Sequence, residues 1–131
     1  MTDQPDQHTA LTAEFQELRQ ELRNKDCRHQ DSALDAQQAS ALLAALEDWR
    51  IQDDSLCKDF SFKNYYRTMA FVNLVAWLAH QQDHHPEMQV GYNRCTVRYR
   101  THSVADGAGG LSENDFICAA KLDALTAGRQ A

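Results

Sequence analysis

The amino-acid sequence predicts an α+β fold of two layers, in which a four-stranded antiparallel sheet carries helices packed on one face. Two observations lead to this prediction. Apolar residues recur with helical spacing in four segments, and apolar and polar residues alternate in four shorter segments. Along the chain the segments run helix, helix, two strands, helix, two strands, helix, which gives a ββαββα core preceded by N-terminal helices.

An amphipathic helix is predicted from Thr9 to about Lys25, after a polar start at 1–8. Its apolar residues recur every three or four positions: Leu11, Phe15, Leu18 and Leu22. We expect this helix to lie on the surface and to cover an edge of the core. A polar stretch at 26–32 separates it from the rest of the chain.

A second helix is predicted to begin at a capping box formed by Asp35 and Gln38 and to end near Asp48. After it the period changes to the two-residue alternation of a β-hairpin that turns at 53–54. Lys58 stands among the apolar positions of the second strand, either as an exception on the buried face or at a sheet edge.

A third helix is predicted for residues 63–80, and it holds more apolar residues than one sheet face needs. We therefore expect it to pack on another helix or subunit as well. It must end before Pro86, because the residue before a proline is forced out of the helical region. This places His84 and His85 on a loop.

A second hairpin is predicted from strands at 88–92 and 95–101. Tyr92 and Trp49 are interpreted as core residues, because each falls on the apolar side of its strand. A loop at 103–110 contains three glycines. Ser112 and Asp115 then form a capping box at the start of the last helix. This capping role is a sufficient structural reason for an aspartate at position 115.

Composition narrows the classes of function. The chain has 131 residues, which suits one domain, and its 43% hydrophobic and 24% charged content is ordinary for a globular protein. The formal charge of −6 argues against nucleic acid as a partner. The apolar run at 69–79 is too short to span a bilayer, and the N-terminus has no secretory pattern. Four cysteines without a C-x-x-C pair fit reduced thiols in the cytoplasm.

Three histidines are the candidate chemical groups. His84, His85 and His102 fall within nineteen residues, near a loop and a strand end that could bring their rings together. Imidazole has the side-chain pKa nearest neutrality, so such a cluster suits proton transfer. The alternatives are a solvated polar loop and a three-histidine zinc site. Adjacent histidines in an extended loop tend to point apart, and no zincin-like spacing is present, so no metal is predicted.

An ordered set of motifs resembles the signature of the pterin-4a-carbinolamine dehydratase family. The set comprises Asp-His-His-Pro-Glu at 83–87, Tyr92, Thr101-His102 and Gly110-Leu111-Ser112-x-x-Asp115, preceded by Trp49, Phe60-x-Phe62 and the apolar helix at 71–76. The resemblance covers about 34–126. It leaves an N-terminal extension with the amphipathic helix at 1–33 and a tail at 127–131.

The resemblance implies a cytoplasmic hydro-lyase of the tetrahydrobiopterin pathway, a 4a-hydroxytetrahydrobiopterin dehydratase, that needs no cofactor. Such an enzyme converts 4a-hydroxytetrahydropterin into quinonoid dihydropterin, so that the cofactor of aromatic amino-acid hydroxylases is recycled. It is expected to be a homo-oligomer, a tetramer or a dimer, with a possible link to such a hydroxylase and no membrane partner. The implied catalytic residues are His84, His85 and His102, and the implied pterin-binding residues are Asp83, His84, His85, Arg100, Thr101, His102 and Ser103.

Within this resemblance we expect His84 and His102 to be the acid and base, in either order, and His85 to orient the pterin. Asp83 could hold one ring in its useful tautomer. The chain departs from the family pattern at Met88, His80 and Asn114 and in a longer loop at 103–110. Two alternatives stay open: a non-catalytic binding module that acts as a dimerisation or transcription cofactor, and a dehydratase-like protein for another pterin, such as a molybdopterin-type compound.

Overall fold

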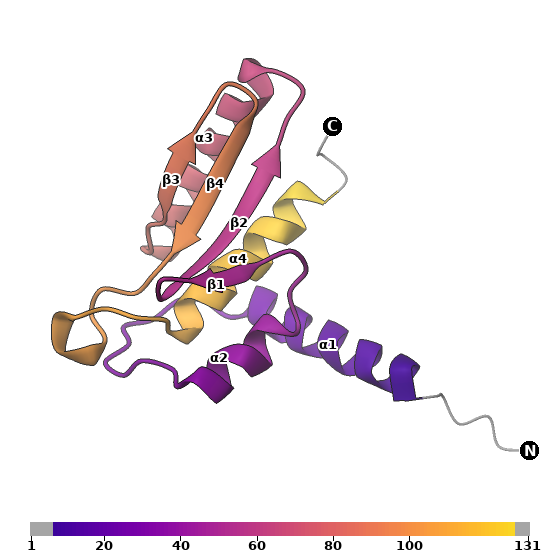
Figure 1. Ribbon diagram of the computed structural model, residues 1–131, viewed down its shortest axis with the longest axis vertical. Helices are drawn as coiled ribbons and strands as arrows, with labels where there is room; N and C mark the ends of the chain where they lie inside the picture. The colour runs from indigo at the N-terminus through magenta and orange to yellow at the C-terminus, as the bar shows by residue number, and fades with distance from the viewer. Residues whose placement is uncertain (1–6, 128–131) are drawn as a thin grey trace, which may run out of the picture.

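The computed structural model describes residues 7–127 of the chain (Figure 1). The predicted polar start at 1–6 and the end of the tail at 128–131 lie outside the described residues. The helices are α1 (Gln7–Asn24), α2 (Ala36–Leu43), α3 (Tyr65–Gln82) and α4 (Glu113–Thr126). The strands are β1 (Arg50–Gln52), β2 (Ser55–Ser61), β3 (Glu87–Val90) and β4 (Arg94–Tyr99).

The strands form one antiparallel sheet in the order β1-β2-β4-β3. The central pair aligns Leu56 with Tyr99 and Phe60 with Cys95, so that the apolar side chains of both strands share one face. Helices α3 and α4 lie behind this face of the sheet, and the opposite face is open (Figure 1). The predicted α+β class, with a four-stranded antiparallel sheet and helices on one face, is therefore confirmed.

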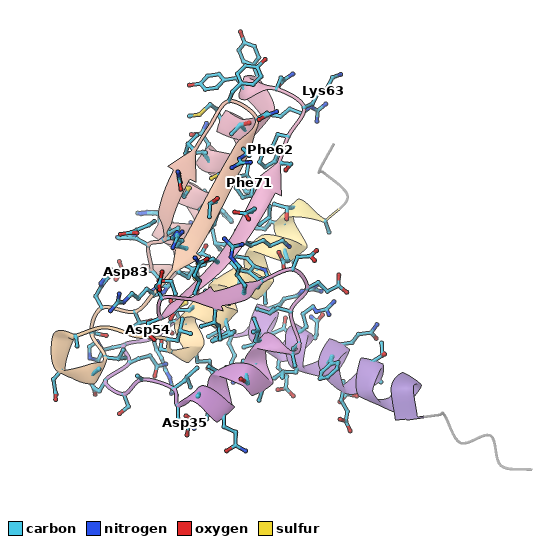
Figure 2. All side chains as sticks on the ribbon, viewed as in Figure 1. Asp35, Asp54, Phe62, Lys63, Phe71 and Asp83 are labelled. Carbon is cyan, nitrogen blue, oxygen red and sulfur yellow. The ribbon has the colours of Figure 1, made fainter. Side chains whose placement is uncertain are left out.

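Aromatic side chains fill the space between the sheet and the helices. Phe60 lies between Trp49 and Phe71, with ring centroids 6.1 and 4.5 Å away. Figure 2 shows Phe62 and Phe71 side by side near the end of β2, while Lys63 projects outward beyond them. Trp49 is buried, as the sequence predicted. Large aromatic rings of this kind contribute most of the apolar area that a small core can remove from water.

Lys58 lies on the buried face of β2 and not at an edge, because β2 is an interior strand of the sheet. Its ammonium group forms an ion pair of 2.9 Å with Asp123 on α4. The same group lies over the rings of Trp49 and Phe60, at 5.7 and 5.0 Å from their centroids. The ion pair and the ring contacts explain how a lysine can occupy an apolar position.

Helix α1 packs against α4 and contributes Leu22, which is only 1% exposed, to the main core. Two hydrogen bonds support the packing: Arg19 Nε donates to the carbonyl of Ala45 at 2.8 Å, and Lys121 Nζ donates to the carbonyl of Arg23 at 2.7 Å. The predicted surface helix therefore does cover an edge of the core.

Two sequence predictions about the elements were wrong. Helix α2 ends at Leu43 and not near Asp48, because the chain tightens into i to i+3 hydrogen bonds at 45–46 and Asp48 then takes a left-handed φ of 66°. Tyr92 is not a core residue. It follows β3 in a turn and is 68% exposed, since β3 already ends at Val90.

Helix α3 buries one face and leaves the other open. Its buried residues are Thr68, Phe71, Val75, Leu78 and Ala79. The outer face consists of Tyr66, Ala70, Asn73 and Trp77, of which Tyr66 is 82% and Trp77 is 52% exposed. Exposed aromatic residues in such a row are typical of surfaces that bind another protein.

Candidate active site

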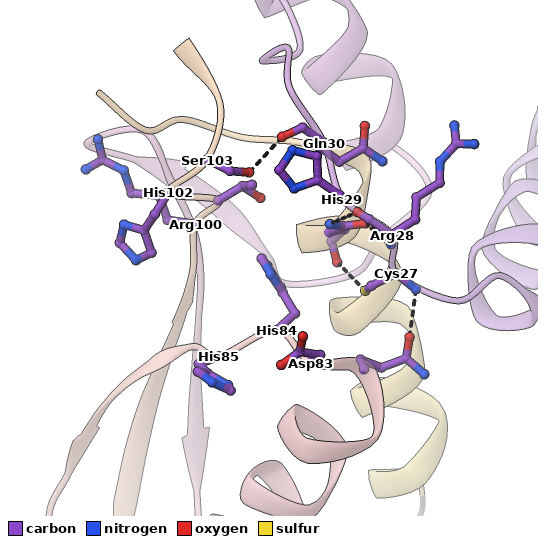
Figure 3. A pocket seen from close by; sticks show the side chains of 13 residues that line it. Cys27, Arg28, His29, Gln30, Asp83, His84, His85, Arg100, His102 and Ser103 are labelled. Atoms are coloured by element: carbon purple, nitrogen blue, oxygen red, sulfur yellow. Dashed lines mark hydrogen bonds between the residues drawn. The ribbon is translucent and has the colours of Figure 1, made fainter. Parts of the chain in front are cut away.

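A pocket of about 500 Å³ lies where the end of α3, the end of β4 and the start of α4 meet (Figure 3). All seven residues predicted from sequence line it: Asp83, His84, His85, Arg100, Thr101, His102 and Ser103. The two parts of the predicted site are thus brought together by the fold, although they lie on opposite sides of the β3–β4 hairpin.

The first histidine is positioned by the way α3 ends. Asp83 is the C-cap residue and has a left-handed φ of 50°. The following amide of His84 donates to the carbonyl of Ala79 at 3.1 Å, which closes the helix in a tight C-terminal turn. Because the chain reverses at Asp83, the side chain of His84 points into the pocket (Figure 3).

Asp115 holds the His84 ring. The Nε2 of His84 lies 2.7 Å from Oδ1 of Asp115, and the Asp115 side chain is completely buried. The other carboxylate oxygen, Oδ2, accepts hydrogen bonds from the amide of Ser112 and the hydroxyl of Thr101, both at 2.9 Å. Asp115 is therefore both a helix cap and the partner of the imidazole. The sequence suggested that Asp83 could hold one of the histidine rings. The carboxylate that holds the His84 ring is instead that of Asp115.

The surroundings of His84 favour its protonated form. Burial alone lowers the pKa of this imidazole, but the hydrogen bond and the negative charge of Asp115 outweigh burial, so the pKa is raised above its ordinary value of 6.5. The buried ring of Tyr99 lies parallel to the imidazole, at an angle of 9° and a centroid distance of 6.0 Å. The Nδ1 atom makes no hydrogen bond within the described residues, which leaves it available to a bound molecule.

The raised pKa gives a prediction for stability. A group whose pKa is higher in the folded than in the unfolded chain stabilises the fold fully below the unfolded value, here about 6.5, and loses that effect as the pH rises through the folded value. Urea unfolding of wild type and His84→Gln between pH 5.5 and 9 measures this contribution of His84 to the free energy of unfolding. We expect the stability difference between the two proteins to shrink as the pH rises; a difference that grows would contradict the ion pair.

Arg100 is fixed by the loop that follows β4. Its Nη2 donates to the carbonyl of Ala108 at 2.7 Å, and its guanidinium lies against Gly109. A Cβ atom at Gly109 would come within 2.8 Å of Arg100 Nε, and Gly109 also has a φ of +86°. Gly109 therefore allows the close approach that keeps Arg100 at the pocket.

Gly109→Ala is expected to destabilise the protein by about 2 kcal/mol, through backbone strain and the clash with Arg100. Gly107→Ala is the matched control, because Gly107 has a similar φ of +87° but no atom within 4 Å of the added Cβ. Chemical denaturation measures both. Equal losses for the two variants would mean that the contact with Arg100 is unimportant.

His85 and His102 are both exposed and both border the pocket. They also line a smaller hollow of about 90 Å³ on their other side, together with Ser55, Glu87, Arg98 and Arg100. In contrast to His84, neither ring has a hydrogen-bond partner within the part of the chain that the structure describes. Their rings are thus free to rotate toward a ligand.

Sequence reasoning missed one wall of the pocket. This wall is the segment 26–30, which we call the strap, and its residues Cys27, Arg28, His29 and Gln30 line the cavity. Gln82 and Asn114 also line it and were not predicted. In Figure 3 the His29 ring extends over the pocket from the side opposite His85. Because it has no periodicity, the sequence of the strap predicts only a polar stretch between two elements.

Hydrogen bonds from distant residues hold the strap in place. Asn114 accepts from the amide of Arg28 at 3.1 Å and donates to its carbonyl at 2.6 Å. Gln82 accepts from the amide of Cys27 at 2.8 Å, and Ser103 donates to the carbonyl of Gln30 at 2.7 Å. Asn114, a departure from the family pattern in the sequence, therefore has a structural role.

The described residues contain neither a metal-binding cluster nor a membrane-spanning helix. Between residues 7 and 127, no group of three or more histidine, cysteine, aspartate or glutamate side chains is arranged to hold a metal ion. None of the helices in the same range combines the length and the apolar character needed to cross a bilayer.

Comparison with known proteins gives consistent matches. The family model for pterin 4 alpha carbinolamine dehydratase matches residues 32–125. A Bdellovibrio bacteriovorus protein that carries the name of a pterin-4-alpha-carbinolamine dehydratase is 54% identical over 110 residues, which cover 84% of this chain and 91% of that protein. A match of 110 residues in a chain of 131 reaches back at least to residue 22, so it includes the strap.

Solved structures agree with these matches. The crystal structure of a transcriptional coactivator/pterin dehydratase from Brucella melitensis has a TM-score of 0.65 and 31% identity, and the similarity covers 72% of this chain and 98% of that one. A pterin dehydratase-like protein described as a RuBisCO assembly factor of the alpha-carboxysome has a TM-score of 0.50 and 28% identity, over 60% of this chain and 89% of that one.

Proposed function

Since this chain belongs to the pterin 4α-carbinolamine dehydratase family, we propose that it dehydrates 4a-hydroxytetrahydropterin to quinonoid dihydropterin by histidine acid–base catalysis. In the cell this step would regenerate the tetrahydropterin cofactor of an aromatic amino-acid hydroxylase. One observation supports the proposal most: His84, His85 and His102 border one pocket, and the His84 ring is fixed by a buried carboxylate.

The reaction is an elimination. A proton must reach the hydroxyl group that leaves C4a, and a proton must leave a ring nitrogen whose lone pair expels that group as water. No electrons are gained or lost overall. Two imidazoles of opposite protonation state are suited to these two transfers, and each contributes about 10²- to 10⁴-fold in rate when well placed.

We assign the acid to His84. Its raised pKa means that more of this imidazole is protonated at neutral pH than in an ordinary histidine. Asp115 occupies Nε2, so the proton available to the substrate is the one on Nδ1. After the proton leaves, the neutral ring keeps its Nε2 hydrogen bond to Asp115, and the ring orientation is preserved for the next turnover.

We assign the base to His102 and the orientation of the pterin to His85. Both rings are exposed at the pocket and have no partner within the described residues that would hold a proton in place. Arg100 and Ser103 supply hydrogen-bond donors at the same rim, and Asp83 supplies an acceptor. Thr101 lines the pocket too, but its hydroxyl is committed to Ser112 and Asp115, so its proposed role is to position Asp115.

The decisive experiment follows quinonoid formation from chemically generated 4a-hydroxytetrahydropterin, with and without the purified protein. We expect the protein to accelerate the dehydration well above the spontaneous rate. A folded protein that gives no acceleration would contradict the proposal. Repeating the assay with pterins that carry different C6 side chains, including a molybdopterin-type compound, would identify the preferred substrate.

We place this activity in the cytoplasm, because the four cysteines at 27, 57, 95 and 118 are all free thiols in the structure. Secreted proteins of this size commonly join their cysteines in disulfides, whereas the cytoplasm keeps thiols reduced.

A second function, binding to a protein partner, is favoured by the outer face of α3 defined above. The aromatic residues of this face gain contact area only when another surface covers them, and a second copy of the chain is the partner we propose. The names of the two structural relatives support this proposal: one is described as a transcriptional coactivator/pterin dehydratase, and the other as a RuBisCO assembly factor.

Trp77→Glu is expected to convert the proposed homo-oligomer into a monomer of 14.9 kDa, because a carboxylate that replaces an aromatic ring in a contact between two chains is costly to bury. Light scattering after size exclusion measures the mass. Gln37→Glu, at an exposed position of α2, is the matched control and should leave the mass unchanged. A monomeric wild type, or an oligomeric Trp77→Glu, would contradict the role of this face.

A further inference from the structure

Two cysteines lie in contact beside the pocket, and the proposed dehydration uses neither of them. Cys27 Sγ on the strap lies 3.5 Å from Cys118 Sγ on α4, although the residues are 91 positions apart in the chain. Cys27 is half-buried and lines the pocket, so a small molecule can reach it. Cys118 is completely buried behind it. An accessible thiol in contact with a buried one is the arrangement of an attacking and a resolving cysteine.

We propose that Cys27 and Cys118 form a redox-modification site, at which a hydroperoxide converts the two thiols into an intramolecular disulfide. A disulfide has an S–S length of about 2.0 Å, so the sulfurs must approach by about 1.5 Å. The strap can supply this movement, because it belongs to no helix or strand and is held by side-chain hydrogen bonds. This thiol chemistry does not require the proposed dehydratase activity, although Cys27 lines the same pocket as His84.

The chemistry proceeds in two balanced steps. The Cys27 thiolate attacks one oxygen of hydrogen peroxide, the O–O bond breaks, and Cys27 becomes a sulfenic acid. The departing hydroxide takes up the proton that the Cys27 thiol had released, which gives one water. The Cys118 sulfur then attacks the Cys27 sulfur, the S–O bond breaks, and a second water leaves with the proton of Cys118. Both cysteines are oxidised by two electrons in total, and the peroxide is reduced.

The surroundings of the two thiols suit their different roles, Cys27 as the attacking and Cys118 as the resolving cysteine. The hydrogen bond from Cys118 lowers the pKa of Cys27 in spite of burial, and the positive charges of His84 and Lys121 act in the same direction. The same hydrogen bond and burial raise the pKa of Cys118 far above its ordinary value. Cys27 is therefore the thiol that ionises and reacts first, and Cys118 keeps its proton until the second step.

The other two cysteines serve as internal controls. Cys57 and Cys95 are buried in β2 and β4, and their thiols donate to the backbone carbonyls of Ser55 and Thr96 at 3.7 and 3.9 Å. Burial raises the pKa of both thiols, that of Cys95 to about 11. Neither has a second sulfur within reach, so both are expected to stay reduced while Cys27 and Cys118 react.

The test treats the full-length protein with hydrogen peroxide, blocks the remaining thiols after denaturation, and maps the peptides by mass spectrometry. We expect a loss of 2 Da and a Cys27–Cys118 cross-linked peptide, with Cys57 and Cys95 blocked as thiols. Cys118→Ala is expected to stop at a sulfenic acid on Cys27 that dimedone captures, and Cys27→Ser to show neither product. Cys95→Ser, the matched control, should form the cross-link normally.

A second readout is thermal unfolding. A bond that spans 91 residues restricts the unfolded chain, so the oxidised protein is expected to unfold about 5 to 10 °C higher than the reduced one, and Cys27→Ser should show no such shift. Oxidation of Cys57 or Cys95 in preference to Cys27, cross-links between two chains, or a stable sulfinic acid on Cys27 with Cys118 left as a thiol would each overturn the proposal.

Discussion

His84→Gln is expected to lower kcat for dehydration of 4a-hydroxytetrahydropterin by about 10²- to 10⁴-fold, because a well-placed general acid contributes about that much. Glutamine can still donate to Asp115 through its amide, so the variant should remain folded. Stopped-flow measurement of quinonoid formation at several substrate concentrations separates kcat from KM. We expect KM to change far less than kcat.

The pH dependence makes this prediction more specific. An acid must be protonated, so wild-type kcat should fall as the pH rises through the pKa of His84, which is raised by Asp115. His84→Gln should lose this alkaline decrease. His80→Gln is the matched control, since His80 is an exposed histidine of α3 that does not line the pocket. If His84→Gln kept the kcat and pH profile of His80→Gln, His84 would not be the acid.

Asp115→Ala is expected to lower the free energy of unfolding by about 3 to 5 kcal/mol. The carboxylate is completely buried and accepts from the amide of Ser112, the hydroxyl of Thr101 and the His84 ring. Its removal leaves three buried donors without their acceptor, one of them on an ionisable ring, and breaking one partner of a buried ion pair typically costs this much. The N-cap of α4 is weakened at the same time.

Chemical denaturation of Asp115→Ala and Asp83→Asn compares the two carboxylates directly. Asp83 is exposed, and asparagine tolerates its left-handed backbone, so Asp83→Asn should stay within about 0.5 kcal/mol of wild type. Asp115→Asn offers a milder change that keeps the side-chain shape. A loss for Asp115→Ala no larger than that for Asp83→Asn would show that the carboxylate contributes little to the fold.

The features predicted correctly from sequence were those with local causes. The alternation of apolar residues in β4 and the capping boxes of α2 and α4 depend on neighbours within a few positions. The second role of Asp115 could not be found in this way. Its capping contacts account for one carboxylate oxygen, and the partner of the other oxygen, His84, lies 31 residues earlier. Only the folded chain shows that both contacts belong to one side chain.

The errors have a related cause. The sequence places Tyr92 on the apolar side of a strand at 88–92, but β3 ends at Val90 and Tyr92 lies beyond it, 68% exposed. The strap has neither a helical nor a strand period, and its position is set by side chains 55 to 86 residues away in the sequence. Local sequence patterns therefore predict the helices, the strands and the histidines of the pocket. They do not predict the strap, which forms one wall of that pocket.

The order in which the ribosome makes the chain gives the strap a further consequence. The ribosome makes the strap well before it makes Asn114, the residue that anchors Arg28 of the strap. Between these two points the nascent protein can form its first hairpin but not the finished cavity, so Cys27 and the pocket histidines stay unenclosed until α4 has been translated. The pocket is thus enclosed only after α4 has been made, and slow translation of α4 would prolong the unenclosed state.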